Sequence, residues 1–94
     1  MYLVKRTKEF EKAYKKIKHS GLEKKIRPQL EFVVDNLSSG KVLDKKYQDH
    51  QLKGEFKDYR ECHIKPDILL MYEIKNKELI LILINIGSHS QLFG

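Results

Sequence analysis

The stretch DYRECHIKPD, residues 58–67, holds the densest set of reactive side chains in the sequence. It places an arginine, a cysteine, a histidine and an aspartate within ten residues of a chain that has four histidines in all. Histidine suits acid-base catalysis because its reference pKa, about 6.5, lets it take up or release a proton near neutral pH. The stretch could therefore hold a catalytic histidine, a metal ligand or only the solvated face of a strand.

Cys62 and His63 are adjacent in a segment whose composition predicts a strand. Neighbouring side chains of a strand point to opposite faces, which excludes a catalytic Cys/His pair built from these two residues. Cys62 is predicted to lie in the core, and His63 shares its face with Tyr59 and Glu61. The Glu61 carboxylate could orient His63 or be solvated, and the solvated position is the preferred interpretation.

Three titratable residues from separate segments are expected to converge near His63. Asp67 begins the next strand and could meet His63 at one end of the sheet. His89 directly follows the last strand, and a hairpin would bring it back near Asp67, while His50 arrives from the preceding loop. The spacings match no strong zinc signature, so neither a metal nor a cofactor is expected. Each histidine could also be an ordinary surface residue.

The first half of the chain predicts a short strand and two helices. The segment YLVK, residues 2–5, is a strand candidate, and Thr7 is a candidate N-cap for a helix that ends near His19. A second apolar stripe with helical spacing runs from Leu22 to Leu37. Because Pro28 lies within this stripe, the helix either kinks there or has its main body begin there.

The second half of the chain predicts a sheet. Residues 41–53 are polar and lack clear periodicity, which indicates a loop. The three segments of strand length and composition are Tyr59–Ile64, Ile68–Ile74 and Leu79–Ile86, with a hairpin turn at residues 75–77. The run LILILINI is apolar on both faces and is therefore placed centrally. The sequence predicts one α+β domain over residues 1–94, with a largely antiparallel sheet and helices packed on one side.

Composition limits the class of protein. With 40% hydrophobic and 34% charged residues, the chain has the balance of a soluble globular protein. Its longest apolar run is far shorter than the roughly 20 residues that span a bilayer, and its first ten residues lack a signal peptide pattern. The single cysteine excludes an internal disulfide. We therefore expect a cytoplasmic protein without a membrane partner.

Positive charge is concentrated at the start of the chain. Residues 1–27 carry ten basic and three acidic side chains, whereas the remaining chain is close to neutral. Such a basic half suggests a polyanionic partner, either nucleic acid or an acidic protein. The alternative is a solvated, lysine-rich helix face that keeps the protein soluble.

Three motifs, DHQLKG, YRECHIKPD and GSHSQLFG, resemble in order and spacing the YafQ-type toxins of the RelE superfamily. The resemblance runs from Asp49 to the last residue, and the first half agrees only in its architecture of a strand followed by two helices. It implies a microbial-RNase-like fold and metal-independent cleavage of mRNA on the ribosome. It also implies a cognate antitoxin, with operator DNA contacted only through that antitoxin.

The resemblance also assigns roles to residues. His50, His63, Asp67, His89 and Phe93 match the functional positions of the family. We expect His89 to act as general acid or base, and Asp67 and His63 to share the other proton transfer and orient the 2′-hydroxyl. His50 is expected to contact phosphate. Phe93 could stack on a base or anchor the C-terminus in the core.

Two positions depart from the family pattern. An arginine usually stands two residues before the glycine of GSH, where this chain has Asn85, and Ile68 replaces a tryptophan-like side chain. Loss of a charged contact to the transition state typically costs a factor of about 10² in rate. Arg60, Lys53 and Lys65 are the candidate substitutes for substrate binding. The alternative function is a catalytically weak or inactive toxin homologue that binds its antitoxin and acts as an operator co-repressor.

Overall fold

The chain begins with strand β1, Leu3–Arg6, and passes through Thr7 into helix α1, Lys8–His19. The computed structural model describes residues 1–94. The Thr7 hydroxyl oxygen accepts a hydrogen bond from the Phe10 amide at 3.0 Å, which confirms the predicted N-cap. The helix buries Phe10 and Ile17 on its inner side.

Helix α2, Glu23–Ser38, follows after a turn at Gly21. It begins five residues before Pro28 and continues past it, so its main body does not begin at the proline. Because proline has no amide hydrogen, position 28 cannot donate the helical bond to the Lys24 carbonyl, and the helix continues without it. The buried side chains of α2 follow helical spacing: Ile26, Leu30, Val33 and Leu37.

The segment predicted as a loop, residues 41–53, contains two short regular elements, the 3₁₀ turn η1, Lys45–Tyr47, and strand β2, His50–Gln51. A second 3₁₀ turn, η2, Gly54–Phe56, follows this segment. Leu43 and Tyr47 are buried in the main core. The predicted loop over 41–53 thus includes one 3₁₀ turn and one short strand, which were not predicted because elements of two or three residues are too short to produce a periodic pattern.

The remaining strands are β3, Arg60–Lys65, β4, Ile68–Lys75, and β5, Ile80–Gly87. The five strands form one sheet in the order β1-β5-β4-β3-β2, in which β1 runs parallel to β5 and the other pairs are antiparallel. The predicted α+β class is confirmed, and the run LILILINI, apart from its first residue, lies in β5, an interior strand between β1 and β4.

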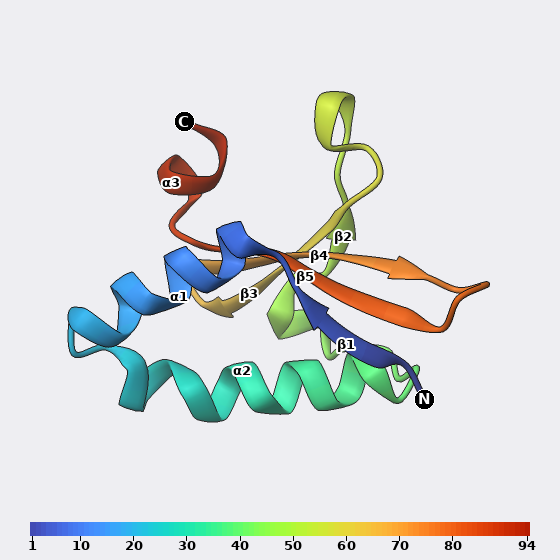
Figure 1. Cartoon of the computed structure of the whole chain (residues 1–94), viewed down its shortest axis with the longest axis horizontal. Coiled ribbons are helices and arrows are strands. Elements are labelled where there is room, and N and C mark those ends of the chain that lie inside the picture. The colour runs from blue at the N-terminus through green and yellow to red at the C-terminus, as the bar shows by residue number, and fades with distance from the viewer.

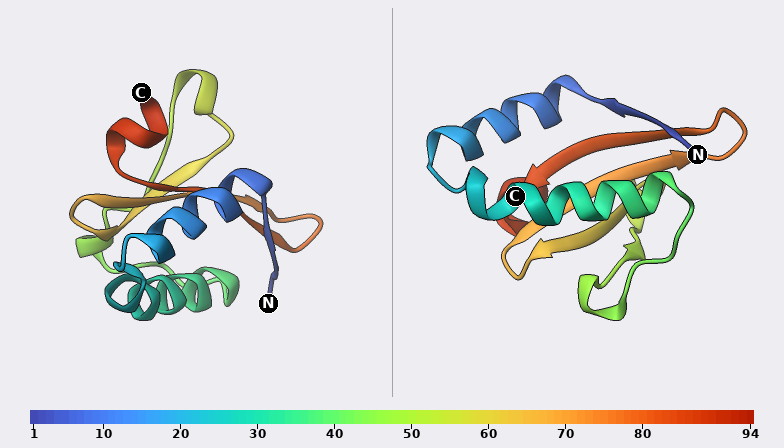
Figure 2. Two further views of the ribbon diagram at one scale, coloured as in Figure 1. Left: turned by 60° about the vertical axis from the view of Figure 1, so that its left-hand side comes forward. Right: turned by 90° about the horizontal axis from the view of Figure 1, so that it is seen from below.

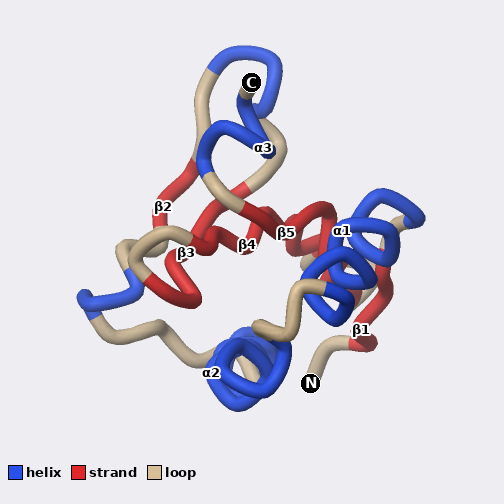
Figure 3. Tube along the Cα trace, turned by 90° about the vertical axis from the view of Figure 1, so that its left-hand side faces the viewer, coloured by secondary structure: helices blue, strands red, loops and turns tan.

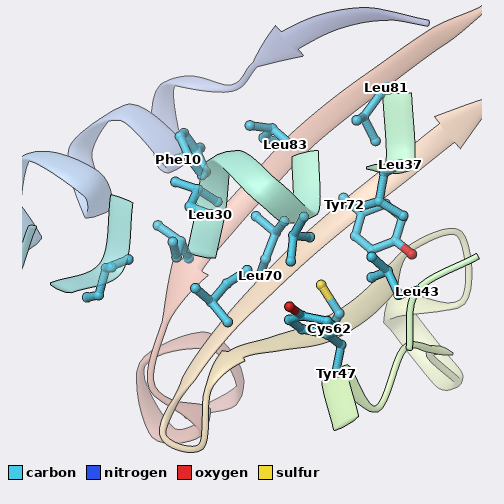
Figure 4. Close-up of a cluster of buried hydrophobic side chains, with 14 of the residues drawn as sticks. Phe10, Leu30, Leu37, Leu43, Tyr47, Cys62, Leu70, Tyr72, Leu81 and Leu83 are labelled. Carbon is cyan, nitrogen blue, oxygen red and sulfur yellow. The ribbon is translucent and has the colours of Figure 1, made fainter. Parts of the chain in front are cut away.

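The two long helices and the short C-terminal helix α3, His89–Phe93, lie on different faces of this sheet (Figures 1 and 3). Helices α1 and α2 pack against one face, as predicted, and enclose a core of 15 buried residues (Figures 2 and 4). Helix α3, which the sequence did not predict, lies on the other face. None of the helices has the length and apolar character needed to cross a membrane.

A bulge in β5 decides which side chains face α3. Tyr72 of β4 pairs with Leu83, whereas the preceding Met71 pairs with Asn85, so Ile84 is the extra residue. This insertion keeps Leu83 in the main core and leaves Ile84 and Asn85 on the α3 side.

The start of α1 holds this bulge in place. The Thr7 hydroxyl donates to the Ile84 carbonyl at 2.6 Å, and the Thr7 amide donates to the Leu83 carbonyl at 3.1 Å. The extra carbonyl is thus satisfied although it has no ladder partner.

Candidate active site

Helix α3 starts with a capping box that fixes the position of His89. The Ser88 hydroxyl accepts from the Gln91 amide at 3.2 Å, and the Gln91 side-chain oxygen accepts from the Ser88 amide at 2.8 Å. Gly87 precedes the box with φ +157°, and a Cβ there would lie 2.6 Å from the Gln91 side-chain oxygen. The sequence signal that was missed is the Ser-x-x-Gln spacing of this box.

Helix α3 is held against the sheet by its aromatic and apolar side chains. Leu92 is buried in a small cluster with side chains of β4. Phe93 is half-buried and meets Phe56 edge to face, with ring centroids 5.2 Å apart, and it also contacts the His89 ring at 4.9 Å. Phe93 therefore partly anchors the C-terminus, which was one of its two expected positions.

Two neighbouring rows of the sheet collect the other candidate residues on the α3 side. One row is His50, Glu61, Met71 and Asn85, and the next is His63, Leu69 and Gly87. Since strands lie about 4.8 Å apart, His63 is about 10 Å from Gly87. His89 follows Gly87 by two residues, so the structure brings the three histidines to the same end of this face.

The half-exposed ring of His50 is oriented at both nitrogens. Its Nδ1 lies 2.7 Å from the Gln48 carbonyl oxygen, and because a carbonyl only accepts, Nδ1 carries a proton and donates. Its Nε2 lies 3.6 Å from an oxygen of Glu61, which is 5% exposed. The expectation that Glu61 is solvated was wrong, and its carboxylate faces His50. In the neutral ring Nε2 is free to accept a proton, and the resulting charge would face a carboxylate.

His63 has one buried and one accessible nitrogen. Its Nδ1 is buried without a hydrogen-bond partner, and its Nε2 makes no hydrogen bond within the chain. A neutral ring protonated on Nε2 leaves only a lone pair at the buried position, which costs less than burying an unpaired N–H. Nε2 is then the nitrogen that can exchange a proton with a ligand.

Asp67 lies in the turn between β3 and β4 at this same end of the sheet and is exposed. No hydrogen bond or ion pair joins it to His63 or His89. Its side chain lines a groove of about 580 Å³ that also contains Lys12 and Lys16 of α1. The predicted meeting of His63 and Asp67 is thus a proximity of chain segments without a direct contact.

Asn85 lines the same groove, and its side-chain oxygen accepts from the Ile86 amide at 2.9 Å. Lys12 and Lys16 share this groove with Asn85, and the sequence had assigned them only to a general basic surface. Lys53 is exposed where the loop enters η2.

Arg60, also expected to bind substrate, points to the face opposite His63 and forms an ion pair with Asp49 at 3.2 Å. Cys62 lies on that opposite face as well and is fully buried, as predicted. Burial raises the pKa of the Cys62 thiol far above its usual value, so the thiol stays protonated.

The chain matches the family described as bacterial toxin of type II toxin-antitoxin system, YafQ, over residues 2–94. It is 42% identical over 48 residues to the mRNA interferase toxin YafQ of Escherichia coli K12, covering 51% of this chain and 50% of that protein. It is 55% identical over 31 residues to a putative toxin YafQ of Haemophilus influenzae, which is 33% of this chain and 30% of that protein. The chain thus aligns with half or less of these curated relatives.

Solved structures resemble the whole fold. A metal-bound toxin from Helicobacter pylori is 46% identical with a TM-score of 0.88, and a copper-bound mutant toxin from the same organism is 41% identical with a TM-score of 0.90. Each comparison covers 99% of this chain and 100% of the other. The Escherichia coli DinJ-YafQ complex has a TM-score of 0.84 at 25% identity, with all of both chains covered.

The metal in these two toxins raises the question of whether this chain could hold one. No group of three or more His, Cys, Asp or Glu side chains is placed to bind a metal ion. His50 and Glu61 offer only two possible ligands, fewer than the three protein ligands of a catalytic zinc site. The residues present do not form a complete metal site.

Proposed function

Because the chain belongs to the YafQ family of bacterial toxins of type II toxin-antitoxin systems, we propose that it is an endoribonuclease that cleaves mRNA on the ribosome. The observation that carries this proposal is the gathering of His50, His63 and His89 at one end of the α3 face, where His50 and His63 each have a nitrogen free to exchange a proton. Acid-base cleavage of RNA needs such groups.

In the proposed reaction the 2′-hydroxyl oxygen of one nucleotide attacks its own 3′-phosphorus, and the bond from phosphorus to the 5′-oxygen of the next nucleotide breaks. A base removes the proton of the 2′-hydroxyl, and an acid donates a proton to the departing 5′-oxygen. The products are a 2′,3′-cyclic phosphate and a 5′-hydroxyl, so atoms and charge balance without water or a metal ion.

We assign His89 to one of these proton transfers, and Nε2 of His63 to the other with help from Asp67. His50, once protonated and facing Glu61, is placed to contact the phosphate. Phe93 presents part of its ring beside His89, where it can stack on a base.

Cleavage of mRNA by purified protein on translating ribosomes tests this proposal. His89→Ala should lower the cleavage rate by a factor of about 10² or more, because general acid-base catalysis typically contributes 10²–10⁴-fold. His19→Ala is the matched control, since His19 is exposed at the far end of α1. Equal losses in the two variants would remove His89 from the reaction.

A chelator separates the proposed chemistry from metal-assisted cleavage. Protein that has been treated with EDTA and then freed of the chelator should cleave mRNA on ribosomes, which themselves need Mg²⁺, at an unchanged rate, because no step uses a metal held by the protein. Full loss of cleavage after this treatment, restored by adding a transition-metal ion to the protein, would contradict the mechanism.

The partners follow from the family. The Escherichia coli relative is solved with DinJ, and we propose that this chain likewise binds a cognate antitoxin in the cytoplasm and reaches operator DNA only through it. Asn85 favours a second function, a catalytically weak or inactive module that binds the antitoxin as co-repressor, because its amide brings no charge to the phosphate. Absence of cleavage by the unaltered protein on translating ribosomes would favour that second function.

A further inference from the structure

The strand that carries His50 has little backbone support of its own. Strand β2 is two residues long and lies at the edge of the sheet, where His50 pairs with Glu61 and Gln51 pairs with Arg60. A strand this short does not hold a side chain in one orientation by its ladder bonds alone. The His50 ring itself contacts Gln48 and Glu61, and further contacts support the backbone on either side of it.

Those contacts come from the residue before His50. Side chains alternate along a strand, so Asp49 points to the opposite face from His50. One carboxylate oxygen of Asp49 accepts from the Tyr72 hydroxyl, and the other accepts from an Arg60 Nη at 3.2 Å. Arg60 Nε in turn donates to the Tyr72 hydroxyl oxygen at 3.3 Å, which closes a three-membered network.

The residue after His50 is held in a similar way. The side-chain Nε2 of Gln51 donates to the Lys57 and Tyr59 carbonyls at 2.5 and 2.9 Å, and its side-chain oxygen accepts from an Arg60 Nη at 3.4 Å. Arg60 therefore contacts both neighbours of His50. The histidine sits between two anchored residues and faces the other side of the sheet.

The network is anchored in the core, and its Tyr72 and Arg60 side chains keep fixed protonation states. Tyr72 is 0% exposed and lies in the main core near Leu43 (Figure 4). Burial, followed by the hydrogen bond to Asp49, raises the pKa of Tyr72 far above its usual value, so its hydroxyl remains a donor. Burial works against the charge of Arg60, but hydrogen bonds to Tyr72 and Asp49 and the charge of Asp49 raise the pKa of Arg60, which remains a cation.

We propose that Asp49, Arg60 and Tyr72 are positioning residues that act from the core face to hold His50 in its working orientation. This inference rests on the proposed function, in which His50 contacts the phosphate. It gives Arg60 a role different from direct substrate binding. A catalytic group displaced by about 1 Å can lose about 10² in rate, so loosening this network should lower kcat while the protein stays folded.

Tyr72→Phe is the primary test because it removes only the hydroxyl and keeps the ring that fills the core. Tyr47→Phe is the matched control: Tyr47 is also buried, and its hydroxyl lies 3.4 Å from Gln29, away from β2. We expect Tyr72→Phe to reduce kcat for RNA cleavage about tenfold or more with little change in KM, and Tyr47→Phe to leave both near their original values.

Graded replacement of Asp49 separates positioning from stability. Asp49→Asn keeps an oxygen that accepts from Tyr72 and should retain more activity than Asp49→Ala, which loses both bonds. Each variant is assayed well below its thermal midpoint, so that the cleavage rates compared are those of folded protein. A loss that tracks only the thermal midpoint would overturn the proposal.

Nitrogen-15 NMR shows which nitrogen of the His50 ring carries the proton, and it tests the orientation of the ring without an activity assay. In the unaltered protein the proton should reside on Nδ1, because that atom donates to Gln48. Tyr72→Phe and Asp49→Ala should shift the ring toward the mixed tautomers of a free histidine, whereas Tyr47→Phe should not. Unchanged tautomers together with unchanged kcat would overturn the inference. If the unaltered protein does not cleave RNA, the proposed function fails, and the NMR result alone still decides whether the network orients His50.

Discussion

Replacement of Gly87 by alanine should disable the site by moving His89. The new Cβ would lie 2.6 Å from the side-chain oxygen of Gln91, far inside van der Waals contact. The Gln91 side chain must then leave, which breaks its bond to the Ser88 amide and opens the capping box that starts α3.

Two energetic costs determine how much stability the Gly87→Ala variant loses. Loss of a helix cap costs about 1 kcal/mol, and a side chain at φ +157° adds roughly 1–3 kcal/mol of backbone strain. The protein should therefore lose about 2–4 kcal/mol of unfolding free energy. If the start of α3 moves by about 1 Å, cleavage should fall by about 10² through misplacement of His89.

Gly40→Ala provides the control for strain alone. Gly40 also has a positive φ, +76°, but a Cβ there meets no atom within 4 Å, and the residue lies at the end of α2 away from α3. Both variants should lower the thermal midpoint, but only Gly87→Ala should lower the cleavage rate of the folded protein. Equal cleavage rates for the two variants would refute the link between the capping box and the position of His89.

Three further changes test separate parts of the account. Asn85→Arg should raise cleavage about tenfold or more by adding a cation for the transition-state phosphorane, and an unchanged rate would show that the site already has one. Leu79→Gly should raise the unfolding free energy by about 1 kcal/mol in denaturant titrations, because Leu79 is exposed with φ +55°, and a loss of stability would contradict this. Charge reversal of Lys12, Lys15 and Lys16 to Glu should weaken ribosome association in a salt-dependent way. Binding that is unchanged at every salt concentration would show that these lysines only form a solvated helix face.

The sequence predicted the parts of the fold that have a long or strongly patterned signal. The cap at Thr7, the interior place of the strand predicted at Leu79–Ile86 and the burial of Cys62 all follow from local rules of capping and side-chain pattern. These rules act within a few residues and need no knowledge of distant contacts.

The elements that were missed depend on tertiary contacts. Strand β2 is defined by its pairing with β3, and α3 is five residues long and is held by packing on β4 and Phe56. The burial of Glu61 could not be inferred from alternation, because a strand position can be solvated or covered depending on what lies over it. The partner that faces Glu61, His50, comes from a segment without a periodic pattern.

The sequence predicted which residues belong to the candidate site, but it did not predict how they are arranged in space. The three histidines were named from motifs, and the register of the sheet brings them to one end of a face. The bulge at Ile84, which places Asn85 on the α3 side, requires one extra residue that only the pairing reveals. For the same reason, the position of Arg60 on the opposite face emerged from its contacts with Asp49 and Tyr72.

The central claim is that this chain cleaves mRNA by a reaction that depends on His89. The most direct measurement is the mapping of mRNA 5′ ends in cells that express the protein without an antitoxin, compared with cells that express His89→Ala at equal level. New 5′ ends within translated reading frames should appear with the unaltered protein and be absent with the variant, which should also relieve growth arrest. The same set of 5′ ends in both cultures, or none in either, would contradict this claim.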